Sequence, residues 1–177
     1  MSRAGWILSL SAMGLVALLV SLALLAVLTR PQDAKLLDAL HAAARDRQPK
    51  MNADFSELFP GDWDRMVIAC RGAAPADVDG ALGFHWDRGR DLKSDSFLST
   101  ILFVRDDAVE ATLSTGADSG WVYVPCPIGV DSTDAVSPSS AVLPRSSAVV
   151  QFTHHPDADS DFWYVDAAEF HRLAEAG

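Results

Sequence analysis

One short segment of the sequence gathers side chains that can bind metal ions. It runs His154-His155-Pro156-Asp157-Ala158-Asp159-Ser160-Asp161, so two imidazoles and three carboxylates stand within eight residues. Imidazole nitrogens bind zinc and related ions, and carboxylate oxygens bind calcium. The function that this segment suggests is a small metal-dependent hydrolase or a metal sensor. Its candidate metal ligands are His154, His155, Asp157, Asp159 and Asp161.

The spacing of these ligands fits a metal site only in part. The three aspartates have the spacing of the first three ligands of a calcium-binding loop. The positions that need a glycine and a final glutamate, however, hold Phe162 and Ala168. Neighbouring residues on a strand point to opposite faces, so the two histidines would rarely bind one ion. We therefore expect a solvated acidic turn between two strands, with a metal site as the alternative.

A second candidate site combines aromatic and charged side chains at His85, Trp86 and Arg88. An exposed aromatic side chain beside charges can bind a partner. The alternative is that Phe84 and Trp86 belong to the core and leave His85 at the surface. Another surface for a partner is the proline- and serine-rich segment 127–146, which we predict to be a long loop.

Motifs for covalent catalysis are absent from the sequence. There is no G-x-S-x-G elbow to present a nucleophilic serine, and neither a serine nor a cysteine stands in a recognisable nucleophile motif. There is also no glycine-rich loop of the kind that binds nucleotide phosphates. We therefore predict no catalytic residues and no organic cofactor, and expect a binding protein rather than an enzyme.

The chain has 177 residues and a net charge of −10, but its apolar and charged residues are separated. Residues 6–28 contain 19 apolar residues out of 23 and no charge, and all 24 acidic residues follow them. A helix of this length measures roughly 35 Å, enough to cross a bilayer core of about 30 Å. We therefore predict one transmembrane helix at residues 6–28, which anchors a single-pass protein in the cytoplasmic membrane.

An uncleaved signal-anchor explains this segment better than a cleaved signal peptide. The apolar run exceeds the about 7–15 residues of the apolar region of a signal peptide, and no small-x-small cleavage site follows it. Positive charges flank both ends, so the positive-inside rule leaves the orientation nearly balanced. The anionic inner leaflet would repel an acidic domain, which favours a domain outside the membrane. The same negative charge would repel nucleic acid.

The two cysteines, Cys70 and Cys126, bear on this location. In an extracytoplasmic domain they can form a disulfide, a bond that is rare in the cytosol. The alternative is a pair of buried free thiols, because cysteine is a common core residue. Neither cysteine has the C-x-x-C spacing of a metal site.

The residues after the anchor predict one α+β domain. Residues 33–48 have helical hydrophobic spacing and form either an amphipathic stalk or a helix docked on the domain. Pro75 and Gly83 bracket a short helix. Strands are expected at residues 66–70, 97–104, 108–115, 121–124, 148–153 and 162–165. Because most strands follow one another through short turns, we expect an antiparallel sheet of about 5–6 strands with helices packed on one face.

The end of the chain predicts a final helix. Asp166 and Glu169 have the Asp-x-x-Glu spacing of a capping box. The expected organisation is a tail at residues 1–5, the anchor at 6–28, the helix or stalk at 29–50 and a soluble domain at 51–177.

Three features resemble small bacterial membrane-anchored and lipoprotein α+β domains of unknown function. They are the run Trp63-Asp64-Arg65-Met66-Val67-Ile68, the short helix that ends at Leu82-Gly83, and the strand Ile101-Leu102-Phe103-Val104 followed by Asp106-Asp107. The resemblance covers residues 55–125. Where that family often has Pro-Tyr after the first strand, this chain has Arg71-Gly72. The resemblance implies an envelope location and carries over no catalytic residue.

These observations lead us to expect a single-pass envelope protein whose acidic domain binds a protein or another envelope component. The metal-dependent hydrolase or metal sensor is the second hypothesis. A third is an inhibitor or immunity-type protein, because an acidic, anchored domain suits a basic toxin.

Overall fold

The computed structural model describes residues 32–88, 97–116, 123–127, 139–156 and 161–176. The chain divides into two compact units, Met1–Ala34 and Lys35–Gly177, and almost all described residues belong to the second. The transmembrane segment predicted at residues 6–28 lies outside the described residues. Within the described ranges, no helix combines the length and apolar composition needed to cross a membrane.

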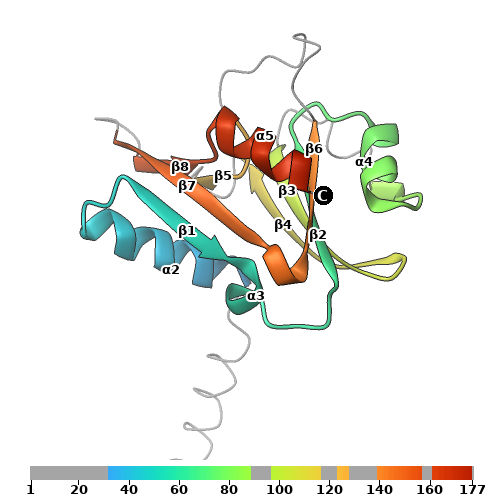
Figure 1. Cartoon of the computed structure of the whole chain (residues 1–177), viewed down its shortest axis with the longest axis horizontal. Helices are drawn as coiled ribbons and strands as arrows, with labels where there is room; N and C mark the ends of the chain where they lie inside the picture. The colour runs from blue at the N-terminus through green and yellow to red at the C-terminus, as the bar shows by residue number, and fades with distance from the viewer. Residues whose placement is uncertain (1–31, 89–96, 117–122, 128–138, 157–160, 177) are drawn as a thin grey trace, which may run out of the picture. The chain divides into compact units, whose positions relative to one another are not determined.

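Two four-stranded β-sheets form the domain, in place of the single sheet that the sequence predicted (Figure 1). The first sheet has the strand order β1 (Lys50–Asp54), β7 (Val149–Pro156), β8 (Asp161–Tyr164) and β5 (Tyr123–Val124). The second sheet has the strand order β4 (Ala108–Gly116), β3 (Phe97–Arg105), β2 (Arg65–Cys70) and β6 (Ser140–Pro144). Neighbouring strands are antiparallel except β5 and β8, which are parallel. The predicted α+β class is confirmed, and the prediction of a single antiparallel sheet is wrong.

Helices accompany both sheets. The described helices are α2 (Gln32–Arg45), α3 (Phe55–Leu58), α4 (Pro75–Leu82) and α5 (Ala167–Ala176), and a 3₁₀ turn, η3 (Arg145–Ser147), joins β6 to β7. Helix α2 falls in the segment for which the sequence leaves a stalk and a docked helix open. Its Leu36 and Leu40 are fully buried in the core, so the docked helix is the arrangement observed.

Two strands, β1 and β6, have no counterpart among the predicted strands. In β1 only Ala53 is fully buried, so the strand lacks an apolar alternation strong enough to detect. β6 lies within segment 127–146, where we expected a loop, although Ala141 and Leu143 alternate into the core. Prolines and serines around β6 give it a loop-like composition. Both strands form by pairing with distant segments, β1 with β7 and β6 with β2.

Strand β2 is buried on both faces and paired along both edges. Met66 and Ile68 face the main core between the sheets, whereas Val67 and Ala69 face a second cluster on the outer side of their sheet. Its neighbours are β3 and β6. A strand that is buried on both faces has a nearly continuous run of apolar residues in its sequence. This explains why the apolar run of β2 could be recognised from the sequence.

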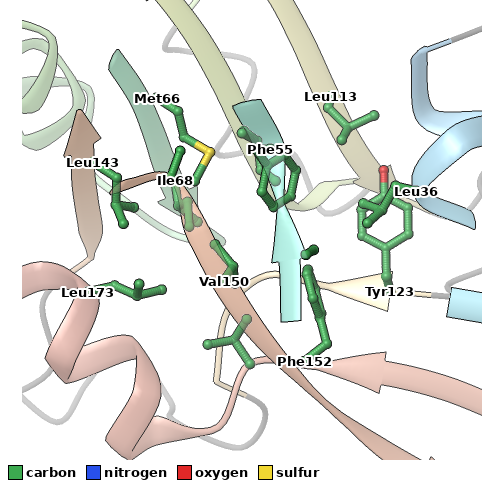
Figure 2. Packing of buried hydrophobic residues seen from close by; sticks show 14 of the residues in the cluster. Leu36, Phe55, Met66, Ile68, Leu113, Tyr123, Leu143, Val150, Phe152 and Leu173 are labelled. Carbon is green, nitrogen blue, oxygen red and sulfur yellow. The ribbon is translucent and has the colours of Figure 1, made fainter. Parts of the chain in front are cut away.

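The main core has an aromatic centre. The rings of Phe55, Phe59 and Trp63 surround Phe103, with centroid distances between 4.9 and 6.2 Å. Such rings bury large apolar areas and add favourable edge and offset contacts. Figure 2 shows side chains from both sheets and from α2 and α5 converging on the same space. The two sheets therefore share one core.

Helix α4 covers the outer face of the second sheet, where Val78 and Leu82 pack in the second cluster. Arg65, at the start of β2, donates hydrogen bonds to the carbonyl oxygens of Leu82 and Asp106, each at 2.8 Å. These bonds tie the end of α4 and the β3–β4 turn to β2. Because α2 and α5 contribute to the main core instead, the expectation of helices on one face of a sheet is wrong.

Helix α5 begins as predicted but uses its glutamate differently. Asp166 caps the helix by accepting a hydrogen bond from the backbone N–H of Glu169 at 2.9 Å. The Glu169 carboxylate does not turn back to Asp166; it accepts the backbone N–H of Gln151 on β7 at 3.1 Å. Two further hydrogen bonds from Arg172 are the main cause of a lowered pKa at Glu169. Strand β8 ends before it could pair with Gln151, so the Glu169 carboxylate supplies the acceptor for the backbone N–H of Gln151.

A disulfide joins the two sheets at one end. Cys70 ends β2 in the second sheet, and Cys126 follows β5 in the first, with 5.7 Å between their Cα atoms. Cys126 is buried, and Cys70 packs partly buried against the main core. The structure therefore contains the bonded pair rather than the two free thiols that were the alternative.

Removing this disulfide should lower the free energy of unfolding. Linking residues 56 positions apart restricts the unfolded chain, which the chain-entropy model values at about 4 kcal/mol. We expect Cys70→Ser/Cys126→Ser to lose about 2–4 kcal/mol in urea unfolding of the full chain in detergent. Reduced wild-type protein is the matched control and should unfold like the double variant. Unchanged midpoints in both samples would contradict a stabilising role.

Candidate functional site

The two histidines of the predicted metal segment lie near the end of β7 and face opposite sides of the first sheet. The strand register pairs His154 with Trp163 and His155 with Phe162. The His154 imidazole stacks on the Trp163 ring with 4.7 Å between centroids, and His155 stacks on Phe162 at 5.0 Å. Trp163 is buried, whereas His155 is exposed. Each imidazole therefore packs on an aromatic cross-strand neighbour.

This arrangement separates the imidazoles instead of joining them at one ion. Among the described residues, no three histidine, cysteine, aspartate or glutamate side chains are placed to hold a metal. Asp157 and Asp159 lie outside the described residues, and Asp161 begins β8 opposite Pro156. The stacked rings fit the expected arrangement, in which β7 and β8 flank the acidic segment. The metal-dependent hydrolase or sensor remains a hypothesis without a described ligand set.

The second candidate site, residues 84–88, follows α4 through a tight turn. Gly83 ends the helix in the left-handed conformation with φ of 81°, and its N–H donates to the carbonyl of Asp79 at 2.8 Å. Phe84 and Trp86 then pack, partly buried, against the second cluster. His85 stands between them with 68% of its side chain exposed. The aromatic residues thus follow the core alternative, and the histidine lies at the surface.

His85 is held between two carboxylates. Its Nδ1 lies 2.7 Å from Oδ2 of Asp79, and its Nε2 lies 3.2 Å from Oδ1 of Asp87. An ionised carboxylate only accepts hydrogen bonds, and a neutral imidazole can donate from only one nitrogen. Both contacts are therefore favourable together only when the ring is the doubly protonated imidazolium.

Asp79 is the residue that fixes this segment to α4. Its second carboxylate oxygen accepts the backbone N–H of Trp86 at 2.9 Å. The hydrogen bond from His85 is the main cause of the lowered pKa of Asp79, and the Trp86 bond lowers it further. Asp79 is not among the site residues that the sequence predicts, because an aspartate on a short helix is usually a solvated residue. The available signal was its position one helical turn before Gly83, close to a histidine just beyond the turn.

The geometry of residues 84–88 suits binding better than catalysis. Both nitrogens of His85 face carboxylates, so neither is directed at a substrate proton. Asp87 and Arg88 are exposed and present opposite charges to solvent. The residues that follow, 89–96, lie outside the described part of the chain.

The other predicted surface, segment 127–146, is only partly described. Residues 128–138 lie outside the described residues, and β6 occupies 140–144. Just before β6, the Ser139 hydroxyl donates to the Asp77 carboxylate of α4 at 3.2 Å. The described end of this segment is therefore part of the sheet and packs beside α4.

No family model, curated protein or solved structure matches this chain.

The His85 bridge should stabilise the domain only within a limited pH range. It needs the imidazolium, so its contribution is complete below the ordinary histidine pKa of about 6.5 and is lost as the pH rises above that value. It also needs ionised Asp79, whose pKa is lowered from 3.8, so it persists until the pH falls below that value. Wild type should exceed His85→Gln in stability at about pH 5 and converge with it at about pH 8.

Urea unfolding of the full chain at both pH values measures this difference. His171→Gln is the matched control, because His171 is an exposed histidine that contacts Glu175 on α5. Its difference from wild type should change less between the two pH values, because its ring contacts one exposed carboxylate instead of two. An equal stability difference for His85→Gln at both pH values would show that the bridge does not depend on the imidazolium.

Proposed function

We propose that this protein is a single-pass component of the cell envelope whose acidic domain binds a protein partner outside the cytoplasmic membrane. The apolar segment at residues 6–28 supplies the anchor. The observation that carries the location is the Cys70–Cys126 disulfide, because such bonds persist in oxidising compartments and are rare in the cytosol. A domain on the outer side of the membrane keeps this bond and avoids the anionic inner leaflet.

The surface that we assign to the partner is residues 84–88. This segment is held in place by the packing of Phe84 and Trp86 and by the hydrogen bonds of Asp79. Binding a partner therefore costs little conformational entropy in this segment. Its outermost carboxylate, Asp87, has 97% of its side chain exposed. The net charge of −10 favours a partner with a basic surface. An inhibitor or immunity-type role against a basic protein is one form of this function.

A thiol placed on the domain surface should report its location. Ser147 is exposed on η3, so a Ser147→Cys variant of the full chain offers a reactive group. We expect a membrane-impermeant maleimide to label it in intact cells, whereas wild type should stay unlabelled because both native cysteines are bonded. Labelling of Ser147→Cys only after lysis would place the domain in the cytoplasm and remove the basis of the proposed location.

The assigned surface should control capture of the partner. Full-length protein in detergent should recover a stoichiometric partner from envelope extract, and Asp87→Lys should weaken recovery about tenfold through charge reversal. Glu175→Lys is the matched control, since it makes the same charge change at an exposed position on α5. The full chain is needed because α2 contributes Leu36 and Leu40 to the core. Equal recovery by both variants, or no partner at all, would contradict the proposal.

A further inference from the structure

The first sheet turns one of its faces to the main core and the other to solvent. Burial alternates along β7, where Val150 and Phe152 are buried in the main core, whereas Gln151 is half-buried and His155 is exposed. The strand register places side chains of β1 and β8 on the same solvent side. We call this side the open face, and the members that matter below are Lys50, Asn52, Gln151, His155, Phe162 and Tyr164.

Three aromatic rings gather at one end of the open face. The His155 imidazole stacks on the Phe162 ring with 9° between their planes, and Tyr164 lies beside both rings at centroid distances of 6.2 and 6.1 Å. Stacking occupies one face of each ring, and none of the three residues is buried. Among the described residues, the Tyr164 hydroxyl has no hydrogen-bond partner. Accessible aromatic rings with a polar tip are typical of binding surfaces.

Amide side chains occupy the other end of the open face. Gln151 accepts a hydrogen bond from Nζ of Lys50 at 2.9 Å and donates one to Oδ1 of Asn52 at 3.2 Å. These bonds hold both amides in place. Asn52 is exposed, and its side-chain nitrogen has no acceptor within the described part of the chain. Because a strand rises about 3.4 Å per residue, the aromatic and amide ends lie about 14 Å apart along β7.

The charged groups described at this face are engaged within the domain. Lys50 lies 3.6 Å from the Asp166 carboxylate, and Asp54 turns its carboxylate to the backbone N–H of Ser56, where it caps α3. The described open face is therefore nearly neutral, although the chain has a net charge of −10. A neutral face does not suit the basic partner proposed for residues 84–88, and the acidic chain would repel the phosphates of nucleic acid.

We propose that the open face binds a neutral polysaccharide, an extended chain of β-linked pyranose sugars. The faces of such sugars carry axial C–H groups, which are attracted to the negative face of an aromatic ring. Their hydroxyl and acetamido groups can exchange hydrogen bonds with the Tyr164 hydroxyl and the Asn52 amide, which fixes the orientation of the chain. A face about 14 Å long suits an oligosaccharide rather than one sugar. This binding depends on neither the location nor the protein partner proposed above.

Calorimetric titration of the full chain, in a detergent without a sugar headgroup, tests this binding. The probes are cellohexaose and chitohexaose, which are neutral and differ in the hydroxyl or acetamido group at each sugar. We expect wild type to bind at least one of them, and His155→Ala and Asn52→Ala to bind it about three- to tenfold more weakly. His171→Ala, an exposed histidine on α5, is the matched control and should bind as wild type does. Wild type that binds neither probe at millimolar concentration, or equal affinities for all variants, would overturn the proposal.

Two further measurements separate the chemistry of the site from the stability of the fold. Tyr164→Phe removes only the hydroxyl and keeps the ring that packs against the main core, so it should unfold in urea as wild type does but bind the sugar several-fold more weakly. Hexamannuronate is a β-linked chain with a carboxylate on each sugar, and it should bind wild type at least about tenfold more weakly than the neutral probe. Unchanged affinity in Tyr164→Phe, or equal binding of the charged chain, would contradict the proposed site.

Discussion

Strand β2 must bury both of its faces, and the described domain is arranged so that it does. β3 and β6 pair with its two edges, the main core covers one face and α4 covers the other. Its ends are fastened as well. Arg65 at the start binds the end of α4 and the β3–β4 turn, and Cys70 at the end is bonded to the segment after β5. The two candidate binding surfaces, residues 84–88 and segment 127–146, are attached to elements that pack on this strand.

Local signals in the sequence predicted the elements around β2 well. These signals depend only on residues that are close in the sequence. They are the apolar run at residues 66–70, the bracketing Pro75 and Gly83, and the hairpin on either side of residues 105–107. The arrangement in two sheets could not be predicted in this way. A short turn such as η3 predicts that β6 and β7 are neighbours in one sheet, but here the chain passes from one sheet to the other. Strands β1 and β6 form through distant pairing that leaves little local pattern.

The candidate sites show the same difference between local sequence signals and contacts that depend on distant segments. The two-residue period of a strand predicted that His154 and His155 face opposite sides, and β7 has this arrangement. The rings on which they stack could not be predicted, because they depend on the register of β7 with β8. In the same way the sequence indicated His85 as a surface residue. Asp79 was missed because the turn at Gly83 decides which side chains meet.

The disulfide also changes the distance along the chain between strands that must find each other. β6 pairs with β2 from the far side of a long intervening segment, and closing such a loop is an entropic cost that slows folding. Cys126 lies only a short way before β6, and Cys70 ends β2. In the oxidised chain the path between the two strands therefore runs through the sulfur bridge and is much shorter. The order of oxidation and strand docking then becomes a kinetic choice, in which early oxidation makes the last strand of the second sheet a nearly local addition.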